Sequence, residues 1–87
     1  MSYEIIFKPA AEKSFSKFPK DLQLKIVNAI DLLSSNPRPQ GVKKLKSLLN
    51  LYRIRVGDYR VIYSIDEGVL IVSVIKIAHR REIYKNL

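Results

Sequence analysis

Three arginines stand close together in the second half of the chain, in two neighbouring segments with the alternating pattern of β-strands. Arg53 and Arg55 lie in the segment LYRIRV, and Arg60 lies in the segment YRVIYSID that follows it. Guanidinium groups bind phosphate through paired hydrogen bonds, so this grouping is typical of a phosphate site. His79 and Tyr84 come later, and their side chains can carry a proton. These residue types together suit the binding or cleavage of a phosphodiester.

Each feature also has a simpler interpretation. An arginine cluster can be a hydrated face of a sheet, and a histidine at the end of a strand is often only a solvated edge residue. We favour an anion site because nothing acidic in these two segments would lie beside the arginines to offset their repulsion. We therefore expect His79 to act as a general acid or base, with Tyr84 as its partner or as a group that stacks on a base.

Positive charge is concentrated in the same half of the chain. The 87 residues include 16 Lys and Arg against 8 Asp and Glu, a net charge of +8. Residues 43–87 contain 10 basic and 4 acidic side chains. This surplus predicts a polyanionic partner, most commonly nucleic acid, although a basic surface can also serve only solubility. We expect four further residues to bind RNA phosphates: Lys43, Lys44, Lys46 and Arg81.

Composition excludes several classes of site. The chain contains no cysteine and a single histidine, so it cannot form a disulfide, a thiolate metal site or a multi-histidine metal site. The basic half offers neither a carboxylate pair nor a cluster of metal ligands, and we expect no metal or other cofactor. The longest apolar runs, near Val69–Val74, are too short to cross a bilayer, and no signal peptide is evident. We expect one cytoplasmic domain spanning residues 1–87.

The elements that must position these residues follow from spacing. Apolar residues recur with helical spacing between Pro9 and Phe18 and again between Leu22 and Leu33, which predicts two helices forming a hairpin. Alternation and β-branched content predict strands at 3–8, 51–56, 59–66 and 69–79. The expected fold is α+β in the order β-α-α-β-β-β, with the helix hairpin packed on one face of a small, mostly antiparallel sheet.

The predicted turns assign side chains to the two faces of that sheet. With Gly57–Asp58 as a two-residue turn, Arg55 pairs with Arg60, and the aromatic and β-branched residues share the opposite face. We call the side that carries Arg53, Arg55 and Arg60 the arginine face. With Glu67–Gly68 as the second turn, Ile77 and His79 also fall on that face, at its far end. Arg80 and Tyr84 can reach it if the C-terminal tail, residues 80–87, folds back.

These segments resemble a known family. YRIRVGDYRVIY, the ending VSVIKIAHRREIY and the upstream KKLKSL are together similar to the RelE/ParE superfamily of toxins from toxin–antitoxin systems, and the match covers nearly the whole chain. The resemblance to RelE implies a ribosome-dependent endoribonuclease that cuts messenger RNA in the ribosomal A site, without a metal, by attack of the 2′-hydroxyl. It also implies a cognate antitoxin with an acidic, partly disordered segment.

The resemblance implies site residues as well. The family's basic and aromatic site positions are occupied here by Lys46, Arg53, Arg55, Arg60, Arg80 and Tyr84. Arginine replaces the two alternating lysines of the best-known RelE pattern, and arginine does not give up a proton at neutral pH. Proton transfer would then fall to His79 or Tyr84. Two alternatives remain: a ParE-like inhibitor of DNA gyrase without nuclease activity, and a non-catalytic nucleic-acid-binding module.

Overall fold

The computed structural model describes residues 2–45 and 50–85. The elements follow one another as β1 (Glu4–Phe7), α1 (Pro9–Ser16), α2 (Lys20–Leu33), β2 (Lys43–Lys44), β3 (Leu51–Val56), β4 (Tyr59–Asp66) and β5 (Ile71–His79). The predicted α+β order is confirmed. The two-residue strand β2 is an addition to the four predicted strands.

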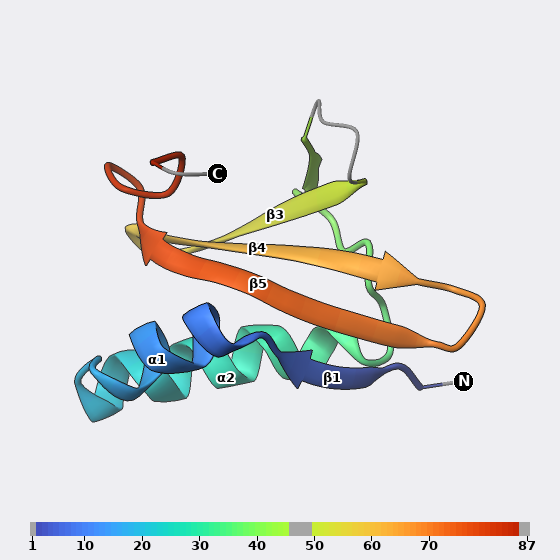
Figure 1. Ribbon diagram of the computed structural model, residues 1–87, viewed down its shortest axis with the longest axis horizontal. Helices are drawn as coiled ribbons and strands as arrows, with labels where there is room; N and C mark the ends of the chain where they lie inside the picture. The colour runs from blue at the N-terminus through green and yellow to red at the C-terminus, as the bar shows by residue number, and fades with distance from the viewer. Residues whose placement is uncertain (1, 46–49, 86–87) are drawn as a thin grey trace.

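The strands form one sheet in the order β1-β5-β4-β3-β2. β1 runs parallel to β5, and the other neighbouring strands are antiparallel. Both helices lie on one side of the sheet, whereas the C-terminal tail, residues 80–85, loops over the other side (Figure 1). In the described ranges 2–45 and 50–85, no helix is long and apolar enough to cross a membrane.

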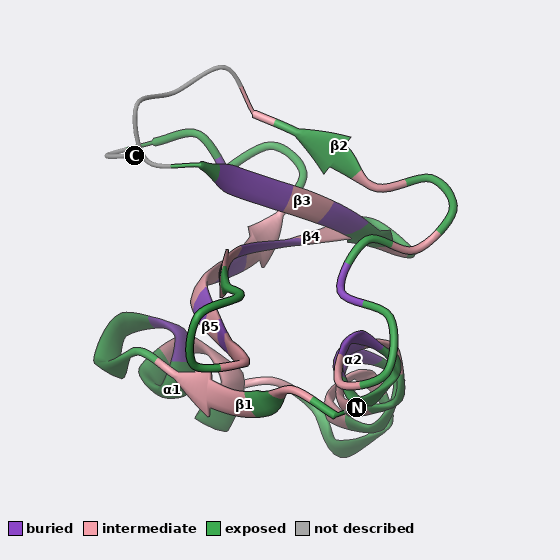
Figure 2. Ribbon diagram, turned by 90° about the vertical axis from the view of Figure 1, so that its right-hand side faces the viewer, coloured by how far each residue is buried: buried purple, intermediate pink, exposed green. Residues whose placement is uncertain are grey.

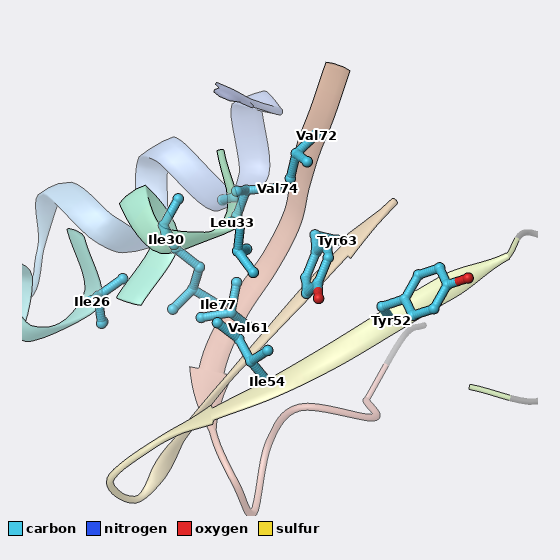
Figure 3. Packing of buried hydrophobic residues seen from close by; sticks show 11 residues of the cluster. Ile26, Ile30, Leu33, Tyr52, Ile54, Val61, Tyr63, Val72, Val74 and Ile77 are labelled. Carbon is cyan, nitrogen blue, oxygen red and sulfur yellow. The ribbon is translucent and has the colours of Figure 1, made fainter. Parts of the chain in front are cut away.

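The main core lies between α2 and the sheet (Figures 2 and 3). Ile26, Ile30 and Leu33 recur on one side of α2 and are almost fully buried. They share the cluster with a set of strand residues on the helix side of the sheet: Tyr52, Ile54, Val61, Tyr63, Val72, Val74 and Ile77. The buried Tyr63 hydroxyl donates a 2.7 Å hydrogen bond to the Pro37 carbonyl, so this polar group is satisfied inside the core.

The β3–β4 hairpin has the predicted register. Arg55 lies opposite Arg60, and Val56 lies opposite Tyr59. Gly57 has φ +59°, the positive value that a two-residue hairpin turn requires of its first central residue and that glycine adopts without a side-chain clash.

The second hairpin differs from the prediction. Its turn contains four residues, Glu67–Leu70, so that Asp66 lies opposite Ile71 and Ser64 lies opposite Ser73. The Asp66 carboxylate explains the longer turn, because its Oδ1 accepts the backbone N–H groups of Gly68 at 3.0 Å and Val69 at 3.4 Å. The expected pairing of Ser64 with Ile71 is therefore wrong by two residues.

A β-bulge then changes the faces along β5. Tyr63 lies opposite Val74, but the next residue of β4, Ile62, lies opposite Lys76, which leaves Ile75 as an extra residue. One extra residue reverses the alternation beyond it. Ile77 now belongs to the main core, and His79 lies opposite Tyr59 on the helix side of the sheet. The prediction that Ile77 and His79 share the arginine face is wrong for this reason.

Candidate functional site

The arginine face combines residues from β2, β3 and β4. Arg53 lies beside Lys43 of β2, and Arg55 lies beside Arg60 of β4. Paired residues project to the same side of a sheet, so these four basic side chains share the face opposite the helices. The grouping of the three arginines, predicted from alternation alone, is confirmed.

Arg60 lies among the positive charges of three other arginines. Its partial burial lowers the pKa of its guanidinium, and the neighbouring charges of Arg55, Arg53 and Arg80 lower it further, in that order. Asp58 acts weakly in the opposite direction. Arg80, the first residue of the tail, therefore belongs to the same electrostatic cluster. An anion bound among these guanidinium groups would relieve their mutual repulsion.

The hairpin turn orients two of these side chains. Arg60 donates to the Gly57 carbonyl at 3.1 Å and to the Tyr59 carbonyl at 3.0 Å, and Arg55 Nε donates to the Gly57 carbonyl at 3.4 Å. A guanidinium has five N–H donors, so these contacts hold the groups near the turn and use only part of their donor capacity.

The tail covers part of the arginine face. Ile83 is 1% exposed and packs with Leu51 and Ile62 in a second apolar cluster, separate from the main core. Sequence reasoning missed this cluster. The sequence did contain an indication of it. Leu51 and Ile62 are apolar residues that alternate with the core residues, so they project to the side of the sheet that was expected to be solvated.

This cluster brings Tyr84 to the arginine face. Arg53 donates a hydrogen bond to the Tyr84 hydroxyl, and the Arg53 guanidinium lies 5.8 Å from the centre of the Tyr84 ring. Tyr84 remains 52% exposed, so about half of its surface is accessible to a ligand. The expectation that the tail returns this tyrosine to the arginine face is confirmed.

The remaining predicted phosphate ligands do not gather in one place. Lys43 borders Arg53, but Lys44 pairs with Tyr52 and lies over that ring, 6.0 Å from its centre, on the helix side of the sheet. Arg81 is exposed in the tail. Lys46 lies outside the described residues.

His79 is separated from this group by the bulge. Its ring makes an edge-to-face contact with Tyr59, with 5.5 Å between ring centres, and its Nδ1 accepts the backbone N–H of Arg81 at 3.2 Å. The arginine face therefore presents guanidinium groups and a phenol, without the imidazole that the sequence suggested. Such a face can hold a phosphodiester, stabilise added negative charge on phosphorus and stack a base on Tyr84.

Comparison with known proteins places the whole chain in one group. Residues 5–84 match the family described as the ParE toxin of the type II toxin–antitoxin system parDE. Toxin RelG of Mycobacterium tuberculosis is 29% identical over 86 residues, covering 98% of this chain and 99% of the relative. Toxin RelE of the same organism is 31% identical over 84 residues, covering 95% of this chain and 87% of the relative.

Solved structures agree with these relatives. A chain of the archaeal RelE–RelB complex from Pyrococcus horikoshii has a TM-score of 0.81 and 32% identity, with 92% of this chain and 97% of that chain covered. The intact RelBE toxin–antitoxin complex of E. coli gives a TM-score of 0.80 at 21% identity, over 90% of this chain and 96% of that chain, which supports the fold.

Proposed function

Because this chain belongs to the RelE/ParE superfamily of toxins of type II toxin–antitoxin systems, we propose that it inhibits translation by cleaving messenger RNA in the ribosomal A site. Relatives named RelE and RelG align over almost its full length. The proposed reaction is attack of a 2′-hydroxyl on the adjacent phosphate, and it takes place in the cytoplasm, where ribosomes are found.

The observation that carries this proposal is the convergence of four guanidinium groups and a phenol on one side of the sheet. The positive charges of Arg55, Arg53 and Arg80 all act on Arg60, and Arg53 also donates a hydrogen bond to Tyr84. Attack on phosphorus adds negative charge to the phosphate oxygens. Fixed guanidinium groups stabilise that charge, and losing one such donor typically costs ~10²–10³-fold in rate.

Tyr84 is the proton carrier that we assign on this face. Its hydroxyl oxygen accepts from Arg53, so its own hydrogen is directed away from the guanidinium and can be donated to the leaving 5′-oxygen. The proton of the attacking 2′-hydroxyl passes to a water molecule, and solvent water then returns a proton to the Tyr84 phenolate. Arginine stays protonated throughout and serves as the electrostatic partner. The ribosome would hold the 2′-oxygen in line with the bond that breaks, which lowers the barrier by orientation.

We infer that a cognate antitoxin neutralises the same surface. The relatives in the archaeal and E. coli structures are described as complexes with RelB. An acidic, partly disordered segment would complement the net charge of +8 and fold on binding. Association should be fast at low salt and markedly slower at high salt, because the charges steer the encounter. An on-rate independent of salt would refute steering by this face.

One observation favours a second function. The matching family model is described as the ParE toxin. The ParE-like alternative is an inhibitor of DNA gyrase that does not cleave RNA. This alternative needs no proton carrier on the arginine face and no contact with the ribosome.

The two functions separate in a direct experiment. Purified protein is added to a translation reaction, the message is examined for cuts by toeprinting, and the same preparation is tested for inhibition of gyrase supercoiling. We expect cuts within codons at the A site, reduced by at least ~10²-fold in Arg60→Gln. Arg38→Gln is the matched control, since it removes an equal charge from an arginine paired with Glu67 in another part of the fold. Gyrase inhibition without cuts would refute the nuclease proposal.

A further inference from the structure

His79 occupies a position that its place in the sequence did not suggest. It is the last residue of β5, and the bulge at Ile75 turns its side chain to the helix side of the sheet. There its ring contacts the Tyr59 ring edge to face, and Tyr59 in turn contacts Phe18 after α1, with 5.1 Å between the ring centres. The ring is thus anchored to the main body of the fold and not to the arginine face.

From that position His79 holds the first turn of the tail. Its Nδ1 accepts the backbone N–H of Arg81 at 3.2 Å, and its carbonyl accepts the backbone N–H of Glu82 at 2.8 Å. Between them, the backbone N–H of Arg80 donates to the Asp58 carbonyl at 2.8 Å. The chain direction at residues 80–82 is therefore defined by backbone groups bonded to His79 and to the β3–β4 turn.

We propose that His79 is a positioning residue, whose ring, through the Nδ1 contact to Arg81, sets the turn that places Arg80 and Tyr84 at the arginine face. Arg80 immediately follows His79, and Tyr84 is five residues further along the chain, so a change in this turn moves both groups. The consequence for RNA cleavage rests on the proposed function, whereas the positioning of the tail does not.

The chemistry of Nδ1 makes the proposal specific. An imidazole nitrogen that accepts a hydrogen bond carries no proton, so the ring proton resides on Nε2. Asparagine can replace this contact, because its side-chain oxygen commonly accepts the N–H of the residue two positions later. Glutamine carries its amide one bond further out, and leucine has no acceptor. If His79 instead transferred protons in the reaction, neither asparagine, glutamine nor leucine could replace it.

The test compares His79→Asn, His79→Gln and His79→Leu with wild type in two measurements. Amide hydrogen exchange of Arg81 and NMR shifts of the Tyr84 ring report the tail in the free protein. Single-turnover cleavage of a ribosome-bound message reports the reaction. We expect the asparagine variant to keep Arg81 protection, the Tyr84 shifts and a cleavage rate within about threefold of wild type. Glutamine and leucine should lose Arg81 protection and at least tenfold in rate.

Two results would overturn the proposal. If His79→Leu keeps Arg81 protection and the Tyr84 shifts, the imidazole does not hold the tail. If His79→Asn keeps the tail in place but loses ~10²–10⁴-fold in rate, the imidazole transfers a proton after all. If His79→Asn fails to protect Arg81, the wild-type protein decides the question. The proposal then requires imidazole ¹⁵N shifts that show an unprotonated Nδ1 at neutral pH. A proton on Nδ1 refutes the contact. A wild-type protein without nuclease activity would refute the proposed function and leave the NMR result intact.

Discussion

Ile83 should act as the anchor that keeps Tyr84 at the arginine face, and its truncation should release the tail without unfolding the domain. The side chain is 1% exposed and packs with Leu51 and Ile62. Ile83→Ala removes three carbon groups at about 0.8 kcal/mol each, so docking weakens by about 2.4 kcal/mol. Since about 1.4 kcal/mol corresponds to a factor of ten, the ratio of docked to undocked tail should fall by about 50-fold.

The loss should stay local because the tail lies across the sheet from the helices (Figure 1). Undocking it exposes the small cluster but leaves the main core of α2 and strands β3–β5 in place. The measurement is amide hydrogen exchange. The amide of Glu82, bonded to the His79 carbonyl, and the amide of Lys85, bonded to the Glu82 carbonyl, should exchange about 50-fold faster, while amides in the centre of β4 change far less.

Ile83→Val is the graded control. It removes one carbon group, about 0.8 kcal/mol, and should accelerate exchange in the tail by only about fourfold. The cleavage rate should fall in the same order, more in Ile83→Ala than in Ile83→Val. Both variants retain every proposed phosphate ligand, so a lower rate reports the undocked tail. Equal acceleration of tail and β4 amides would show that Ile83 belongs to the global folding unit. Unchanged exchange of Glu82 and Lys85 would refute the anchor altogether.

Three further changes test the fold around the site. Tyr63→Phe should destabilise the protein by about 1–3 kcal/mol, because the Pro37 carbonyl loses its donor. Burial raises the pKa of Tyr63 above its value near 10 in the unfolded chain. The contribution of this hydroxyl to the free energy of unfolding is therefore complete below about pH 10 and is lost at higher pH. Urea unfolding above about pH 10 should therefore show a smaller pH-dependent decline in the phenylalanine variant. Arg55→Gln should leave the free energy of unfolding unchanged or raise it by about 0.2–1 kcal/mol at low salt, because Arg55 lies opposite Arg60. The gain should vanish at about 1 M salt. A large loss would show that Arg55 has a structural role. Gly57→Ala should cost about 1–2 kcal/mol in thermal unfolding, because φ is +59° while the added methyl meets open space; an unchanged midpoint would contradict this.

The first β-hairpin could be predicted because its determinants are local. A glycine at the turn and strict alternation on both sides specify which residues pair, and these features placed Arg53, Arg55 and Arg60 on one face without knowledge of the fold. The helix hairpin was predictable for the same reason, since helical periodicity is contained within each segment.

The second hairpin shows where local reasoning ends. Glu67–Gly68 has the composition of a two-residue turn, but the Asp66 carboxylate stabilises a four-residue turn with Leu70 at φ +57°. Nothing in the letters IVSVIKIAH marks Ile75 as the extra residue. The bulge follows Val74, where pairing with β1 ends, so it depends on strands that are far apart in the sequence.

Local sequence patterns therefore specified the two helices, the four longer strands, the arginine cluster and the charge that suits a phosphate ligand. Tertiary structure decided which other groups join the cluster. Docking of Ile83 on Leu51 and Ile62 brings Tyr84 and its hydroxyl to the arginines, and the bulge takes His79 away from them. The physical reason is that alternation within a strand is a local property of the backbone, whereas one inserted residue or one buried side chain from the tail depends on packing between distant segments.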